Sequence, residues 1–194
     1  MRTPYWPLED ADRFDRFWGA KLIMKLGPAQ IRAAVEEAQF SDPRATEYIV
    51  QQLVRRQRKT AYYWFHQVNP LDEFAVHALA GAGASAGAGS GYQLCFSDLL
   101  LKYWVMPKRP ASRTVYEMTG FDYDGRETGW RQAVIGGTRG RVCVDGPPPP
   151  RRGEGYTIVR IRTRRPGLSH DPVLLHLARG PASGAVRIIG LRRL

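Results

Sequence analysis

The apolar residues change their spacing part-way along the chain, and this change constrains the fold more than any other feature. Before residue 79 they recur every three or four positions, as on one side of an amphipathic helix. After residue 91 they alternate with polar residues, as in half-buried β-strands. The sequence therefore predicts an α+β protein whose helices and strands lie in separate regions.

Three helices are predicted before residue 69. The first covers residues 12–26, and Gly27-Pro28 ends it and starts a second helix that reaches about residue 40. Ser41-Asp42-Pro43 combines a capping side chain with a proline in the first turn, which starts the third helix. That helix should end before Asn69-Pro70, because the residue preceding a proline disfavours helical geometry. Three such helices can pack as a small bundle.

The second half predicts an antiparallel β-sandwich or a barrel-like domain. Seven short runs alternate in polarity and are separated by turn-forming residues. The runs are 92–96, 115–123, 130–135, 141–144, 156–163, 173–177 and 186–191. Residues 79–91 are almost entirely Gly, Ala and Ser, which predicts either a flexible linker or an insertion loop. The expected organisation is a helical segment over 1–78, this tract, and a basic antiparallel β-domain over 92–194.

The positive charge is concentrated in the second half. The formal net charge is +11, and residues 1–78 hold 11 Lys or Arg against 10 Asp or Glu, whereas residues 79–194 hold 18 against 8. This asymmetry indicates a region that faces an anionic partner or a compensating acidic one. Of the 29 basic residues 24 are arginine. A GC-rich coding sequence would produce that bias, and so would selection for bidentate recognition of anions.

The best candidate site is the predicted strand 155–165. Alternation places Arg160, Arg162 and Arg164 on one side of it, about 6.5 to 7 Å apart. This spacing is close to the phosphate spacing of a nucleic-acid backbone or of lipid headgroups, so an anionic polymer or lipid surface is the expected partner. Arg151, Arg152 and Arg165 lie nearby in sequence, and Arg151 and Arg152 join the predicted anion-binding set. Alternatively, these arginines keep an exposed strand soluble and pair with acidic side chains.

Two other segments have a binding interpretation and a structural one. Arg55, Arg56, Arg58 and Lys59 precede four consecutive aromatic residues, which is typical of a nucleic-acid stacking surface or of a solvated helix face beside a core face. Pro147 to Pro150, followed by Arg151 and Arg152, matches a ligand pattern of SH3-like domains, or forms a stiff connection between strands.

No catalytic residue, metal site or cofactor is predicted. No Ser/His/Asp arrangement and no suitable pair of carboxylates is found. Residues 122–125 begin like a calcium loop, but the twelfth position is Ala133, so a hairpin turn is expected. His176 lies between two leucines and is predicted to be structural. Cys95 and Cys143 fit no zinc spacing and are predicted to be small core residues. A disulfide between them would require an oxidising compartment, and the sequence leaves that alternative open.

The chain as written predicts a cytoplasmic protein. Its first residues lack the basic and apolar regions of a secretory signal. The longest uncharged run, 74–97, is rich in Ala, Gly and Ser, whose transfer into lipid gains little, so no transmembrane segment is predicted.

The helical segment resembles part of a known group of proteins. Four short motifs are similar to the C-terminal region of uncharacterised bacterial envelope proteins. They are Phe17-Trp18-Gly19-Ala20-Lys21, Gln30-Ile31-Arg32-Ala33, Tyr48 after Ser41-Asp42-Pro43, and Arg55-Arg56 before Trp64-Phe65. The upstream part of those proteins looks kinase-like. The resemblance covers about a third of the chain and transfers no catalytic residue. It implies a native start further upstream, an envelope or periplasmic location, and an upstream catalytic domain or partner protein.

The expected function is that of a non-catalytic binding or accessory module that holds anionic polymers or lipid headgroups on a basic β-face. The alternative is an accessory tail of a kinase-like enzyme whose catalytic region lies outside this chain. A third, purely structural interpretation assigns the arginines only to solubility.

Overall fold

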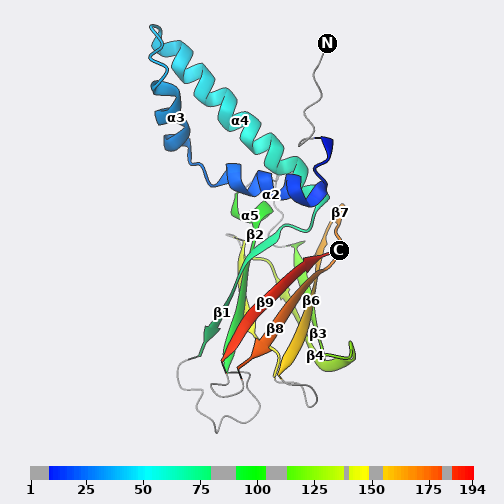
Figure 1. The fold of residues 1–194 in the computed structure, drawn as a ribbon. Helices are drawn as coiled ribbons and strands as arrows, with labels where there is room; N and C mark the ends of the chain where they lie inside the picture. The colour runs from blue at the N-terminus through cyan, green and yellow to red at the C-terminus, as the bar shows by residue number, and fades with distance from the viewer. Residues whose placement is uncertain (1–8, 80–90, 104–112, 138–139, 149–154, 181–184) are drawn as a thin grey trace. The chain divides into compact units, whose positions relative to one another are not determined.

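The computed structural model describes residues 9–79, 91–103, 113–137, 140–148, 155–180 and 185–194. The chain forms two compact units, residues 1–68 and 69–194 (Figure 1). The first is helical and the second is built from antiparallel strands, which confirms the predicted α+β class.

The helical unit contains the three predicted helices, and each of them ends earlier than the sequence pattern. They are α2 (Arg13–Met24), α3 (Pro28–Glu36) and α4 (Pro43–Gln67). Asp12 caps α2 by accepting hydrogen bonds from the backbone N–H groups of Phe14 (2.7 Å) and Asp15 (2.9 Å). Asp42 caps α4 in the same way through the N–H of Arg44 (2.9 Å). The capping signals in the sequence therefore set where these helices begin.

Aromatic and polar contacts join the three helices. Phe17 of α2 meets Phe65 of α4 edge to face, with 5.5 Å between ring centroids. The Gln57 amide of α4 donates to two carbonyl oxygens at the end of α2, at 2.6 and 2.8 Å. Arg32 of α3 forms an ion pair with Glu47 of α4 at 2.5 Å. These contacts attach α2 and α3 to the long helix α4.

The second unit is a sandwich of two antiparallel sheets, one of three strands and one of six. The smaller sheet has the order β1-β2-β5, and the larger has the order β4-β3-β6-β8-β9 with β7 paired to β6. The elements are β1 (Leu71–Ala78), β2 (Tyr92–Asp98), α5 (Leu99–Lys102), β3 (Val115–Phe121), β4 (Glu127–Ile135), β5 (Arg141–Asp145), β6 (Tyr156–Arg165), β7 (Leu168–Ser169), β8 (Val173–Arg179) and β9 (Val186–Arg193). All seven predicted strands are present.

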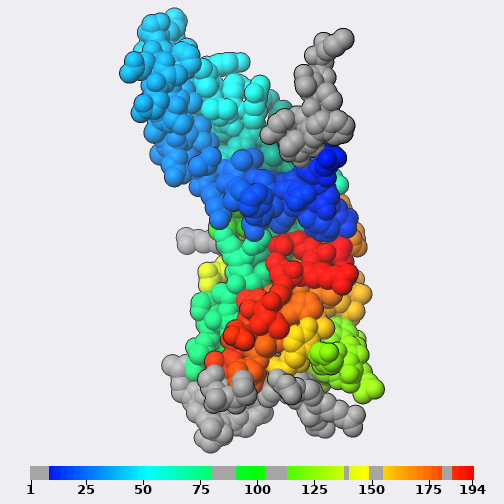
Figure 2. Space-filling model, viewed as in Figure 1, coloured from blue at the N-terminus to red at the C-terminus, as the bar shows by residue number. Residues whose placement is uncertain are grey.

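The core of this unit lies between the two sheets. Alternate residues of both sheets point inward and are almost completely buried. They include Leu94 and Phe96 from β2, Tyr116 from β3, Ile161 from β6 and Leu175 from β8. Side chains also join the sheets at both sides: Arg193 of β9 donates to the Leu71 carbonyl of β1 (2.7 Å), and Gln132 of β4 donates to the Asp145 carbonyl of β5 (3.3 Å). In Figure 2 the surfaces of β1 and β9 lie side by side.

The predicted boundary at residue 78 is wrong, because residues 71–78 form β1 and pair with β2. The observed boundary follows Val68. Alternation in β1 is interrupted by a bulge between Asp72 and Ala75, where Glu73 has a φ of +53°. That extra residue removes the period-2 pattern by which a strand is recognised in a sequence.

The Gly/Ala/Ser tract joins β1 to β2, two paired strands of one sheet. Its central residues, 80–90, lie outside the described residues, so its predicted flexibility stays a prediction. The residues that flank it are hydrogen-bonded, Leu79 N–H donating to the Gly91 carbonyl at 3.0 Å. The tract is therefore a connection within the β unit and does not separate the two units.

Cys95 and Cys143 are bonded to each other in a disulfide. They occupy directly paired positions on β2 and β5. The expectation of two separate core residues is thus corrected, because the register of two strands 48 residues apart in sequence brings the thiols together.

Candidate anion-binding face

The arginines predicted on strand 155–165 project from the outer side of β6. Thr157, Val159 and Ile161 point into the core, whereas Arg162 and Arg164 are exposed. Arg160 is half-buried. β6 is a central strand, paired with β3 on one side and β8 on the other. Its arginines therefore lie in the middle of a broad sheet surface.

The register adds arginines from other strands to the same surface. Thr119 of β3 pairs with both Arg131 of β4 and Arg160 of β6. On the other side, Leu174 of β8 pairs with both Arg160 and Arg192 of β9. Since neighbouring strands lie about 4.8 Å apart, three arginines form a row across the sheet at intervals of about 10 Å.

We call this outer surface the basic face. Its six arginines are Arg131, Arg160, Arg162, Arg164, Arg187 and Arg192. Only the three on β6 were predicted as members of the site. Arg131, Arg187 and Arg192 come from strands distant in sequence. The sequence signal that could have found them is their place among the outward-facing residues of alternating runs.

Two carboxylates lie among these arginines. Glu117 pairs with Arg164 at 2.6 Å, and Glu127 pairs with Arg131 and, at 3.9 Å, with Arg160. The hydrogen bond from Arg131 is the main reason why the pKa of Glu127 is lower than usual, so Glu127 is ionised at neutral pH. Six arginines against two carboxylates leave the face strongly positive.

Arg162 differs from its neighbours on β6. It forms no ion pair with any residue in the described ranges, although its strand partner is Glu117. Arg160 is held by the Glu127 carboxylate and by the ring of Phe121, whose centroid lies 4.7 Å from the Arg160 guanidinium carbon. The pairing expected from the solubility interpretation is therefore present for Arg160 and Arg164, while Arg162 remains available to a ligand.

Two open depressions lie along β6. One, of about 510 Å³, is lined by residues that include Arg131, Arg160 and Arg162. The other, of about 380 Å³, includes Arg113 and Arg164 in its lining. Both are wide and polar, which suits an extended anionic ligand better than an enclosed small molecule. The remaining predicted residues, Arg151 and Arg152, lie outside the described residues.

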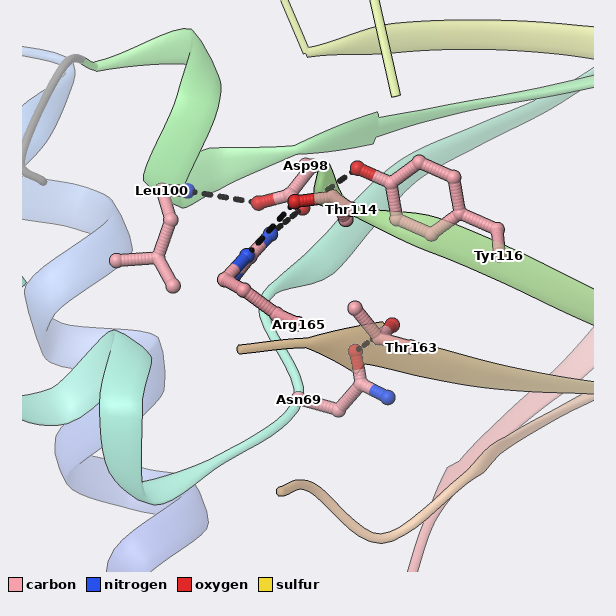
Figure 3. Close-up of polar contacts among 7 residues, drawn as sticks. All are labelled: Asn69, Asp98, Leu100, Thr114, Tyr116, Thr163 and Arg165. Carbon is pink, nitrogen blue, oxygen red and sulfur yellow. Dashed lines mark hydrogen bonds and ion pairs between the residues drawn. The ribbon is translucent and has the colours of Figure 1, made fainter. Parts of the chain in front are cut away.

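Arg165 follows Arg164 in sequence but points into the protein, where it forms a buried ion pair (Figure 3). Its guanidinium contacts the Asp98 carboxylate, and its Nε donates to the Thr114 hydroxyl at 3.0 Å. The Tyr116 hydroxyl donates to the same carboxylate at 2.7 Å. Asp98 also caps α5 by accepting from Leu100 N–H at 3.0 Å.

This buried cluster joins the two sheets, because Asp98 ends β2 while Tyr116 and Arg165 belong to β3 and β6. The side chains of Asp98 and Arg165 are 0% and 1% exposed. Burial, followed by the charge of Asp98, raises the pKa of Tyr116 far above its usual value, so the phenol stays protonated. The cluster holds fixed charges and was not predicted, since nothing local in the sequence marks an arginine that is to be buried.

The described residues contain no group of three or more His, Cys, Asp or Glu side chains placed to hold a metal ion. His176, predicted to be structural, lies on the outer side of β8, where its Nδ1 is 2.5 Å from the Tyr156 hydroxyl. Residues 122–125 form a hairpin turn between β3 and β4, in which Gly125 N–H donates to the Asp122 carbonyl at 3.1 Å.

Among the described helices, none is long and apolar enough to cross a membrane. Comparisons of the chain with protein-family models, curated proteins and solved structures gave no match.

Proposed function

We propose that this chain is a non-catalytic binding module that holds a repeated anion, on a polymer or a lipid surface, against the basic face. The observation that carries the proposal is the register, which collects six arginines and only two carboxylates on one side of a single sheet. An extended array of cations attracts polyanions largely by charge, so binding should weaken as salt rises.

The decisive variant is R160Q/R162Q/R164Q, which removes three positive charges from the face and adds no acidic residue. Each cation near an anionic membrane contributes about 1 kcal/mol, so vesicle binding should fall about 100-fold. The matched control R44Q/R126Q/R141Q lowers the net charge equally, by three, at exposed arginines outside the face. Binding would be measured to inorganic polyphosphate and to phosphatidylglycerol vesicles, which separates a polymer ligand from a lipid one.

The expected result is salt-sensitive binding to one of these probes that the triple variant loses and the control retains. Equal binding by the wild type, the triple variant and the control would contradict the proposal. Thermal unfolding of all three proteins verifies that the variants remain folded.

The disulfide favours one location for this activity. Disulfides persist in oxidising compartments and are rare in the cytosol. We therefore propose an envelope or periplasmic location in preference to the cytoplasm.

The alternative function, an accessory tail of a kinase-like enzyme, is favoured by apolar surface on the helical unit. Trp18 is 60% exposed, and an open groove of about 420 Å³ is lined by residues that include Ile23, Leu26, Ile31 and Leu53. Binding of a hydrophobic dye to the chain, suppressed when an upstream domain is supplied, would support this function over the first.

A further inference from the structure

A second surface with binding chemistry lies on the helical unit, along the solvent side of α4. Tyr48, Tyr62 and Tyr63 are exposed by 64%, 43% and 54%. Arg55 and Lys59 lie between them in sequence and are also exposed. Successive members are separated by seven, four, three and one residues, and an α-helix turns by about 100° per residue, so all five share one side of α4. We call them the tyrosine stripe.

The stripe carries positive charge that no carboxylate offsets. Neither Arg55 nor Lys59 has an ion-pair partner within the part of the chain that the structure describes. The one acidic residue of α4, Glu47, lies on another side of the helix and is paired with Arg32. A hydrogen bond from Arg32 is the main cause that lowers the pKa of Glu47.

The aromatic residues of this segment divide between core and solvent. Phe65 is fully buried against Phe17, so it belongs to the interior of the helical unit. Tyr62 and Tyr63, its neighbours in sequence, face solvent, and the Tyr62 ring lies 4.2 Å from the His66 ring, centroid to centroid. The segment 62–65 therefore supplies both a core contact and exposed rings.

Exposed tyrosines on both sides of two cations without an ion-pair partner match the chemistry of a single-stranded nucleic acid. Bases stack on aromatic rings, and phosphates pair with Arg and Lys. From Tyr48 to Tyr63 the helix rises about 22 Å, which is long enough for several nucleotides of one strand. A helix that lies in a membrane surface needs large aliphatic or tryptophan side chains beside its cations, and the stripe contains neither.

We propose that the tyrosine stripe binds single-stranded nucleic acid, by stacking bases on Tyr48 and Tyr63 and pairing phosphates with Arg55 and Lys59. This site is independent of the basic face, because it lies on a different unit and depends on aromatic rings as well as charge.

The test measures binding of fluorescein-labelled dT15 to the full chain by fluorescence anisotropy at 50 mM salt. Loss of one stacking tyrosine should weaken binding at least about fivefold, so Y48A/Y63A should weaken it at least about 25-fold. The conservative variant Y48F/Y63F keeps both rings and should bind like the wild type. R55Q/K59Q should also weaken binding and reduce its salt dependence.

Controls separate this site from the basic face. Binding of inorganic polyphosphate, which has no bases, should not change in Y48A/Y63A. When Y48A/Y63A is added to the variant R160Q/R162Q/R164Q, dT15 binding should weaken by the same factor as when it is added to the wild type. This factor is independent of any loss of dT15 affinity that the arginine changes cause by themselves. All tyrosines changed are exposed, and thermal unfolding confirms that each variant is folded.

The proposal is overturned if the wild type does not bind dT15 at 50 mM salt, or if Y48A/Y63A binds as tightly as the wild type. It is also overturned if the stripe variants lose binding to phosphatidylglycerol vesicles while dT15 binding stays unchanged, since the stripe would then contact lipid.

Discussion

Replacing Asp98 by asparagine should destabilise the β unit severely. The change keeps the size of the side chain and an oxygen that can accept from Leu100 N–H, but it removes the charge that faces Arg165. The guanidinium is then left buried without a counter-charge. Removing one partner of a buried ion pair costs about 3 to 5 kcal/mol, and we expect D98N to lose that much of the free energy of unfolding.

A double variant provides the control for this prediction. In D98L/R165M both charges are replaced by apolar side chains of similar length, and such replacements are often close to neutral. We expect the double variant to lose less stability than D98N. Its remaining loss should come from the hydroxyl groups of Thr114 and Tyr116 and from the N–H of Leu100, which lose their partners in the cluster.

The free energies of unfolding of the wild type, D98N and D98L/R165M are measured by urea unfolding, which is followed by the circular dichroism of the β-sheets. The urea concentration at which half of the protein is unfolded should fall in D98N. The slope of the free energy of unfolding against urea concentration should change little, because the surface exposed on unfolding is the same. A loss below about 1 kcal/mol in D98N would refute the reasoning, since it would mean that water or a neighbouring group compensates the charge of Arg165.

Two further predictions concern the β unit. Gly140 has a φ of +72°, and a Cβ there would lie 2.6 Å from a backbone oxygen at the end of β2, so G140A should lower stability by at least about 1 kcal/mol, measured by thermal unfolding. Replacing Cys95 and Cys143 by serine removes a cross-link between residues 48 apart, and the free energy of unfolding should fall by about 2 to 4 kcal/mol. Reducing agent should lower the stability of the wild type and leave that variant unchanged; an equal effect on both would contradict this role of the disulfide.

The sequence predicted those elements whose pattern is local. Alternation identified β6 and the outward direction of Arg160, Arg162 and Arg164, because period 2 is a property of the strand itself. It could not predict that Arg131 and Arg192 lie in the same row, since register depends on strands distant in sequence.

Other features escaped prediction for physical reasons of their own. β1 was missed because the bulge at Glu73 breaks its alternation. The buried Arg165 was missed because an arginine that follows three outward-facing ones carries no sign that its partner, Asp98, lies 67 residues earlier. The disulfide depends in the same way on a pairing between strands that are far apart along the chain.

The contacts at the sides of the sandwich have a consequence for proteins that crowd together on a long ligand. A sheet usually ends in strands with free backbone groups, to which another molecule can add a strand and start aggregation. Here the outermost strands β1 and β9 lie in contact, and a side-chain hydrogen bond joins β4 to β5. The Arg193 side chain already donates a hydrogen bond to the Leu71 carbonyl, and the Gln132 side chain already donates one to the Asp145 carbonyl. Two backbone acceptors at the sides of the sandwich are thus unavailable to a strand added by a neighbouring molecule, which matters if copies bind one anionic chain as proposed above.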